Sequence, residues 1–171
     1  MFQAFYPGEY VDSTYEIDFE EFYKKGSRGV IFDIDNTLVP HGAPADDRSR
    51  KLIASLKEMG YSVFLLSNNK EARVKVFNEG QNLDYIHKAG KPFRKNYRRA
   101  MEKMGTTTEN TLFVGDQLFT DVWGAKRTGM HNILVKPIHP REEIQIVLKR
   151  KLERVVLKEY AKKIEKNKKI S

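Results

Sequence analysis

The chain contains no cysteine, and it has one tryptophan and six prolines among its 171 residues. Without cysteine it can form no disulfide bond, no thiolate nucleophile and no zinc–thiolate site. No apolar run approaches the roughly 18 residues that a membrane-spanning helix needs. Residues 1–10 also lack the basic-then-apolar pattern of a secretory signal. We therefore expect a cytoplasmic protein whose membrane contact, if any, is peripheral and at the inner face.

The composition, with 40% hydrophobic and 32% charged residues, is typical of one globular domain that buries a real core. The net charge of +8 is unevenly placed. Residues 149–171 hold ten Lys or Arg against three Glu, while the preceding 148 residues are close to neutral. We therefore predict a domain at 1–148, whose N-terminal segment 1–28 packs onto a sheet, and a basic amphipathic tail at 149–171.

Apolar runs typical of buried strands alternate with helical patterns along the chain. Strands are expected from Gly29 and over 61–66, 84–88, 111–114 and 132–135. Helices are expected over 18–25, 46–59, 70–79, 94–104 and 122–128, several of them followed by glycine. Strands that alternate with helices predict an α/β fold with a doubly wound parallel sheet.

The strand that begins at Gly29 ends in two carboxylates, Asp33 and Asp35, and Thr37 follows two residues later. An unpaired buried carboxylate costs several kcal/mol or more, so charge at the end of an apolar strand indicates a site. The carboxyl ends of parallel strands are also where such sheets bind ligands. The alternative is an Asx turn, in which Asp35 or Asn36 caps the backbone.

The later strands end in further polar residues: Ser67 and Asn68, then Lys91, then Asp116 and Asp121. Each has an ordinary explanation when taken singly, as a helix cap, a solvated lysine or a turn residue. Polar clusters at four successive strand ends are much harder to explain in this way. Because those ends converge on one crevice in a doubly wound sheet, we expect one site.

These residues resemble the four motifs of the haloacid dehalogenase (HAD) superfamily phosphohydrolases. The motifs are Asp33-x-Asp35-x-Thr37, Ser67, Lys91 and Gly115-Asp116-x-x-x-x-Asp121. The longer phrases at 32–39 and 115–121, with the opening Pro7-Gly8-Glu9-Tyr10-Val11, resemble the YqeG group of that superfamily. That group is related to phosphatidylglycerophosphate phosphatases of mitochondria and plastids. The resemblance spans nearly the whole chain and implies a HAD core fold.

The resemblance also implies roles. Asp33 would be the nucleophile that forms an aspartyl-phosphate. Asp35 would protonate the leaving alcohol and then activate water, with Thr37 orienting Asp35 or supporting its loop. Lys91 would stabilise both the phosphate and the acyl-phosphate. Phosphate oxygens would also be bound at a helix N-terminus, by Ser67 and Asn68.

The metal implied by the family is Mg²⁺, which prefers a few carboxylates, substrate phosphate and water. Its expected ligands are Asp33, Asp116 and the backbone carbonyl of Asp35. Asp121 is expected to act through a metal-bound water or to support the ligands from behind.

HAD enzymes that enclose small substrates insert a cap domain, and this chain leaves no room for one. Only a short loop follows Val39, and residues 67–91 hold one helix and a short strand. An open crevice suits a substrate that brings its own bulk. We therefore expect a Mg²⁺-dependent phosphomonoesterase of the capless subclass III, with phosphatidylglycerophosphate favoured by the resemblance alone.

Other functions stay open at this point. The enzyme could act on a soluble nucleotide, a sugar phosphate or a phosphoprotein. A phosphoacceptor receiver domain would place its acidic pair before an acceptor Asp on a later strand, and the order here does not fit. A non-catalytic HAD-fold protein that binds nucleic acid or the ribosome is the remaining class, and the intact set of acids argues against it.

The C-terminal tail has apolar residues at three- or four-residue steps, with basic residues between them: Ile144, Val147, Leu148, Leu152, Val155, Val156, Tyr160 and Ile164. One interpretation is a helix whose apolar stripe docks on the domain. Another is an interfacial helix attracted to anionic lipid. Contact with nucleic acid is disfavoured because the tail lacks interleaved aromatic residues for base stacking.

Overall fold

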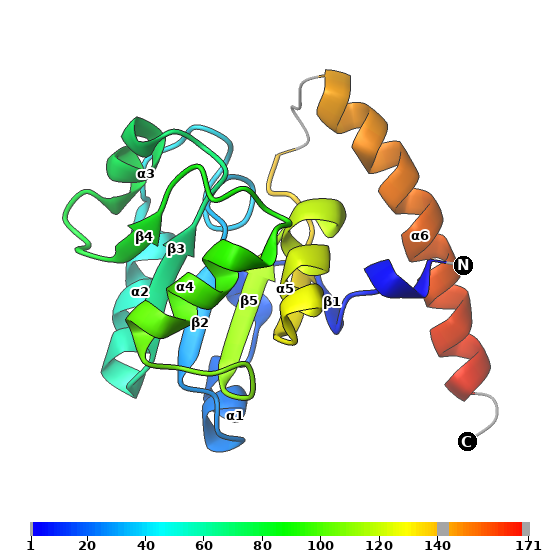
Figure 1. The fold of residues 1–171 in the computed structure, drawn as a ribbon, viewed down its shortest axis with the longest axis horizontal. Coiled ribbons are helices and arrows are strands. Elements are labelled where there is room, and N and C mark those ends of the chain that lie inside the picture. The colour runs from blue at the N-terminus through cyan, green and yellow to red at the C-terminus, as the bar shows by residue number, and fades with distance from the viewer. Residues whose placement is uncertain (1, 140–143, 169–171) are drawn as a thin grey trace.

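The computed structural model describes residues 2–139 and 144–168, and in the second segment it describes side chains from Lys149 onward. Six parallel strands form one sheet in the order β1-β6-β5-β2-β3-β4 (Figure 1). The strands are β1 (Glu9–Val11), β2 (Gly29–Phe32), β3 (Ser62–Leu66), β4 (Asp84–Ile86), β5 (Thr111–Gly115) and β6 (His131–Val135). The predicted doubly wound parallel α/β fold is confirmed.

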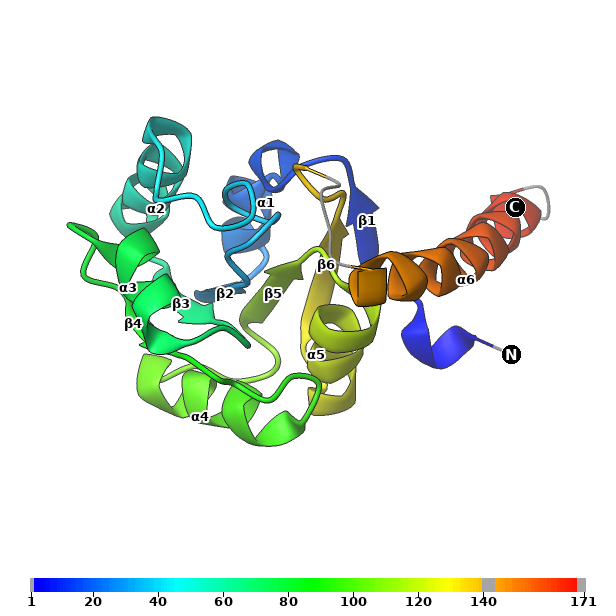
Figure 2. The same cartoon turned by 90° about the horizontal axis from the view of Figure 1, so that it is seen from above.

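Helices cover both faces of the sheet (Figure 2). They are α1 (Phe19–Lys24), α2 (Asp47–Met59), α3 (Glu71–Asn78), α4 (Arg94–Met104), α5 (Trp123–Thr128) and α6 (Ile144–Lys168), with short turns η1 (Gln3–Phe5), η2 (Thr14–Glu16) and η3 (Leu118–Val122). Apolar residues of α1, α2 and α3 share one core layer with the sheet, and those of α4 and α5 form the layer on the other face.

Helix α2 shows why several boundaries were readable from the sequence. The Asp46 carboxylate accepts the N–H of Ser49 at 2.7 Å, and the Ser49 hydroxyl accepts the N–H of Asp46 at 3.0 Å. This reciprocal capping satisfies backbone donors that a helix start leaves unpaired. At the other end Gly60 has a φ of 105°, a left-handed conformation that glycine adopts without steric cost. The helices expected near 46–59 and over 94–104 are confirmed.

The N-terminal segment contains a strand that the sequence analysis did not predict. Glu9–Val11 pairs in parallel with β6 and forms one edge of the sheet. Three residues of mixed polarity carry no periodic signal, and only the neighbouring backbone makes them a strand. The expected short helix is present as α1, where Asp18 accepts the N–H of Glu21 at 2.9 Å.

No cap domain interrupts the described part of the chain. The segment between β2 and α2 is a loop, and only α3 and β4 lie between β3 and α4. The carboxyl ends of the strands therefore stay uncovered by an inserted domain, as expected for a capless HAD fold.

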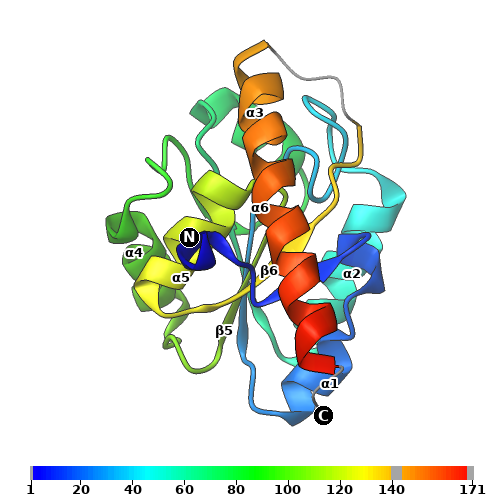
Figure 3. The same cartoon turned by 90° about the vertical axis from the view of Figure 1, so that its right-hand side faces the viewer.

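Helix α6 runs past the β1 edge of the sheet and extends beyond it (Figures 1 and 3). Val156 is fully buried against Tyr6, Leu118 and Leu134, so the helix docks on the domain through this side. The predicted boundary at 148/149 falls inside α6, and the division into domain and tail stays a prediction. The side chains of 144–148, which the predicted stripe included, lie outside the described residues. Among the described helices, none combines the length and apolarity required to cross a bilayer.

Candidate active site

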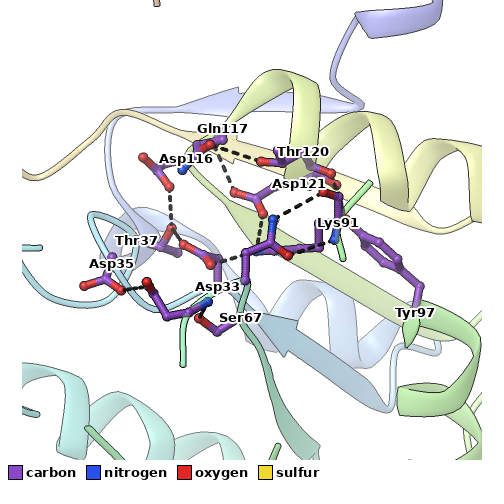
Figure 4. Close-up of polar contacts among 12 residues, drawn as sticks. Asp33, Asp35, Thr37, Ser67, Lys91, Tyr97, Asp116, Gln117, Thr120 and Asp121 are labelled. Carbon is purple, nitrogen blue, oxygen red and sulfur yellow. Dashed lines mark hydrogen bonds and ion pairs between the residues drawn. The ribbon is translucent and has the colours of Figure 1, made fainter. Parts of the chain in front are cut away.

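Three carboxylates meet at the carboxyl edge of the sheet, although they come from distant parts of the chain (Figure 4). Asp33 follows β2, Asp116 follows β5, and Asp121 lies in η3. One carboxylate oxygen from each lies within 4.8 Å of the others, and all three residues are buried. The convergence that the strand-end pattern predicts is therefore present for these residues.

Lys91 joins two of these acids from the loop before α4. Its Nζ lies 2.7 Å from Oδ1 of Asp33 and 2.5 Å from Oδ1 of Asp121 (Figure 4). Burial lowers the pKa of Lys91, but the carboxylates of Asp121 and Asp33 outweigh burial and hold its pKa above the ordinary value. The amine is therefore a fixed positive charge beside the expected nucleophile.

The positive groups around Asp33 and Asp116 do not fully compensate the negative charge of these buried carboxylates. Burial, the largest cause, raises the pKa of Asp33 to about 7 despite the opposing effect of Lys91. Burial and the neighbouring Asp33 carboxylate also raise the pKa of Asp116 well above its ordinary value. Such shifts show that the carboxylate forms are under-compensated by the protein alone. A buried all-oxygen donor set with excess negative charge fits a hard divalent cation such as Mg²⁺.

Arg150 of α6 is a site residue that the sequence analysis missed. Its guanidinium contacts Oδ2 of Asp116, and Nη1 donates to the backbone carbonyl of Asp116 at 2.5 Å. Nη1 also donates to Glu153 at 2.9 Å, and the second oxygen of Glu153 accepts the N–H of Leu118 at 2.9 Å. Arg150 lies in a run of basic residues, so its type gave no signal. The acid at position 153, among so many cations, was the only hint.

Asp35 lies beside the carboxylate cluster and is bound by another set of groups. Nε and Nη2 of Arg73 each donate to its Oδ1 at 3.0 Å, and Asn69 donates to its Oδ2 at 2.7 Å. The N–H of Gly42 adds a bond of 2.7 Å to Oδ1. Neither Asn69 nor Arg73 was predicted. Asn69 lies in the loop after β3 and Arg73 in the first turn of α3, so no shared periodicity in the sequence marked them as a pair.

Thr37 does not orient Asp35, which was one of its two expected roles. Its hydroxyl lies 3.4 Å from Oδ2 of Asp33 and 3.3 Å from Oδ1 of Asp116. Its backbone carbonyl accepts the Thr14 hydroxyl at 2.8 Å. The sharp turn after Asp33 brings Thr37 back between the two acids, so its contacts support the loop and the expected metal ligands instead.

Ser67 and Asn68 lie at the end of β3, as predicted, but their side chains serve the surrounding loops. Ser67 accepts the N–H of Asn69 at 3.1 Å. The Asn68 carboxamide accepts the N–H of Lys91 at 2.8 Å and donates to its carbonyl at 3.2 Å. Asn68 thereby fixes the loop that carries Lys91, and a phosphate-binding role for either residue stays a prediction.

Gly115 explains how Asp121 enters the cluster. A Cβ at Gly115 would lie 2.5 Å from Cγ of Asp121, so no other residue type leaves room for this carboxylate. Oδ2 of Asp121 also accepts the N–H of Gln117 at 3.0 Å. The glycine before Asp116 is therefore a packing requirement of the site, and Asp121 is anchored by backbone as well as by Lys91.

Comparisons with known proteins agree with this geometry. A family model described as HAD-hydrolase-like matches residues 88–145. The probable phosphatase YqeG of Bacillus subtilis is 38% identical over 154 residues, which cover 90% of each chain. Phosphatidylglycerophosphate phosphatase 1 of Arabidopsis thaliana, chloroplastic/mitochondrial, is 30% identical over 160 residues. That match covers 86% of this chain and 45% of the Arabidopsis protein.

Solved structures share the fold at low sequence identity. An uncharacterized protein from Corynebacterium glutamicum matches with a TM-score of 0.54 and 20% identity, over 72% of this chain and 95% of the other. The cobalt-bound deoxy-D-mannose-octulosonate 8-phosphate phosphatase from Haemophilus influenzae matches with a TM-score of 0.51 and 14% identity, over 66% and 80% of the two chains. The chain is 38% identical to the Bacillus protein over nine-tenths of both chains, and it carries the four motifs at one edge of its sheet. It therefore belongs to the YqeG group of the HAD superfamily phosphatases.

Proposed function

We propose that the chain is a Mg²⁺-dependent phosphomonoesterase that works through an aspartyl-phosphate on Asp33. The observation that supports this most directly is the buried cluster of Asp33, Asp116 and Asp121 with Lys91 bonded to two of them. A cluster with this much buried charge is costly for a structural role alone, because each uncompensated carboxylate disfavours folding.

In the first half-reaction a carboxylate oxygen of Asp33 attacks phosphorus while the bond from phosphorus to the ester oxygen breaks. Asp35 gives a proton to the departing oxygen, which leaves as an alcohol. In the second half-reaction Asp35 takes a proton from water as the water oxygen attacks the same phosphorus, and Asp33 departs as a carboxylate. Arg73 and Asn69 hold the Asp35 side chain in place, as a carboxylic acid in the first step and as a carboxylate at the start of the second.

Mg²⁺ would be held by the carboxylates of Asp33 and Asp116 and by the backbone carbonyl of Asp35, with Asp121 one contact further away. A bound Mg²⁺ screens the negative charge that the phosphate and the attacking carboxylate share. Lys91 supplies a fixed positive charge beside Asp33, where it would stabilise the anionic oxygens of the phosphoryl group.

Phosphatidylglycerophosphate is the substrate that we favour. The similarity to the Arabidopsis enzyme supports it, and so does the absence of an inserted cap in the described chain, because an uncovered site admits a headgroup that stays attached to a bilayer. A soluble phosphate ester is the second candidate, and the Haemophilus enzyme of the same fold, named for such a substrate, illustrates it.

A panel of phosphate esters that includes phosphatidylglycerophosphate, assayed for phosphate release with and without Mg²⁺, tests this function. We expect release only with Mg²⁺, and a complete loss in Asp33→Asn with the fold retained by circular dichroism. Turnover by that variant would refute the nucleophile assignment. Hydrolysis of soluble esters alone would refute the lipid substrate and leave the phosphatase chemistry standing.

We also propose that the protein works in the cytoplasm, with α6 making peripheral contact with anionic membrane. Leu152 and Val155 are 55% and 53% exposed, on the side of α6 that faces away from the domain, and cations lie beside them. Replacing the exposed Lys158, Lys162 and Lys166 with Gln should weaken co-sedimentation with anionic vesicles. Equal binding of the wild type to neutral and anionic vesicles would refute the proposed contact between α6 and anionic lipid.

A further inference from the structure

A second concentration of positive charge lies outside the tail and outside the catalytic cluster. Residues 88–103 contain seven Lys or Arg and one acid, and all of these cations except Lys91 lie outside the cluster. Because the tail accounts for +7 of the chain's net +8, the rest of the domain must be net acidic to balance this stretch. The near-neutral sum over residues 1–148 therefore conceals a basic stretch within an otherwise acidic domain.

Most of this charge lines an open groove of about 670 Å³ between α4 and α5. We call the residues that line it the α4 surface: Phe93, Arg94, Lys95, Arg98, Arg99 and Arg127. Glu102 is the one acid in the groove. The helices lie on the face of the sheet opposite α1 and α2, and α6 departs from the β1 edge, so the α4 surface is separate from the basic tail (Figure 2).

The cations of the α4 surface are not used to hold the protein together. Arg94, Lys95, Arg98 and Arg99 are exposed, and none forms an ion pair with any residue in 2–139 or 144–168. Arg127 is placed by a different contact, since its guanidinium stacks over the Trp123 ring at 4.9 Å. Unpaired like charges on adjacent turns repel one another, and a polyanionic partner would relieve that repulsion.

Phe93 gives this basic groove an apolar tip. It is 68% exposed, more than any other large hydrophobic side chain in the described residues. It is also only two residues from Lys91, whose side chain is 3% exposed and bonded to Asp33. Two residues span at most about 7 Å of backbone, so Phe93 belongs to the loop that carries Lys91, which we call the rim of the active site.

We propose that the α4 surface docks on a membrane rich in anionic lipid, with Phe93 inserted among the headgroups. A cluster of cations around a single exposed apolar side chain is the pattern of interfacial attachment. Single-stranded nucleic acid would instead favour several aromatic rings for base stacking, and the groove offers one. Docking here brings the rim of the active site against the bilayer.

This proposal deepens the proposed function and rests on it only for the identity of the substrate. A lipid phosphate ester has to be reached at the membrane surface. An active-site rim that itself binds the surface removes the need to extract the lipid. Binding to vesicles that contain no substrate can be measured without turnover, so the two ideas can fail separately.

The test is co-sedimentation of the full chain with vesicles of phosphatidylcholine alone or mixed with phosphatidylglycerol. Each basic residue near an anionic surface contributes about fivefold to binding, so Arg98→Glu/Arg99→Glu should lower binding to the mixed vesicles at least ~20-fold. Phe93→Ser should lower it at unchanged charge. Both variants should retain hydrolysis of soluble p-nitrophenyl phosphate, because neither touches the carboxylate cluster.

The matched control is Lys24→Glu/Lys51→Glu, which makes the same charge change at exposed positions on the opposite face of the sheet. It should retain vesicle binding. Equal losses of vesicle binding in the two double variants would overturn the proposal for the α4 surface. So would unchanged vesicle binding in Arg98→Glu/Arg99→Glu. If Arg98→Glu/Arg99→Glu lost oligonucleotide binding and kept vesicle binding, the proposal would also be overturned. Vesicle binding by a wild type that fails to hydrolyse phosphatidylglycerophosphate would refute the substrate and leave the surface standing.

Discussion

The guanidinium of Arg150, on the C-terminal helix, contacts both the side chain and the backbone carbonyl of Asp116, an expected metal ligand. The tail is thus connected directly to the catalytic cluster. Glu153 strengthens the connection, because it bonds Arg150 on one oxygen and the N–H of Leu118 on the other. The sequence pattern of α6 is that of a solvated run of charges, yet the helix contacts the carboxylate cluster of the active site.

Arg150→Gln should bind Mg²⁺ more tightly than the wild type. The guanidinium neutralises the Asp116 carboxylate, and one unit charge at ion-pair distance is worth at least about 1 kcal/mol, or about fivefold in affinity. Calorimetric titration with Mg²⁺ measures this without turnover. Arg154→Gln is the control, since it removes the same charge from an exposed position on the same helix. Weaker binding in Arg150→Gln would instead mean that Arg150 orients Asp116 for the metal.

The metal-free protein should lose stability as the pH rises from about 4 to about 7. Burial raises the pKa of Asp33 to about 7 in the folded state, above its ordinary value near 3.8. The folded protein then binds a proton that the unfolded chain has released, so stability falls across this window and levels off above it. In thermal melts with EDTA, the Tm of Asp33→Asn should rise relative to the Tm of the wild type as the pH increases from about 4 to about 7. A constant difference between the two proteins would contradict the raised pKa.

Arg73→Lys should lower kcat far more than it changes KM. Arg73 places two donors on one oxygen of Asp35, and a single ammonium group cannot reproduce that fork. Misplacing an acid–base group by about 1 Å costs roughly 10²-fold in rate. Steady-state kinetics on a soluble ester measures the split, with Lys75→Met on the same helix as the control. A change confined to KM would show that Arg73 serves substrate binding and not the position of Asp35.

Gly124→Ala should destabilise the fold, and Tyr97→Phe should partly rescue it. A Cβ at position 124 would lie 2.2 Å from the Tyr97 hydroxyl oxygen, where α4 packs on α5. Overpacking of this kind costs about 1–3 kcal/mol. Removing the hydroxyl relieves the shortest contact, while Cζ and Cε2 of the ring stay at 2.5 and 2.7 Å, so the rescue is partial. Urea unfolding of both single variants and the double variant gives the coupling energy. Strict additivity of the two effects would show that α5 shifts to avoid the clash.

Some residues of the active site could be predicted from the sequence, and others could be identified only in the structure. The predictable residues were those that end a strand or follow one closely, because the strand ends of a parallel sheet converge. They are Asp33, Asp35, Lys91, Asp116 and Asp121. Arg73, Asn69 and Arg150 were not predicted as site residues. Their types are common on exposed helix surfaces, and only packing against Asp35 or Asp116 distinguishes them from solvated residues. Thr37 was placed at the site, yet its contact with Asp33 and Asp116 depends on a loop conformation that spacing does not reveal.

By itself the sequence determined the α/β class, most helix boundaries and the edge of the sheet where the acids gather. These features are local or periodic, since capping residues, glycines and apolar runs act within a few positions of one another. Only the tertiary structure decided that residues 9–11 pair with β6, that Arg150 reaches Asp116 and that the α4 cations line one groove. Those relationships join residues distant in the chain, and their partners are fixed by packing geometry that no local pattern encodes.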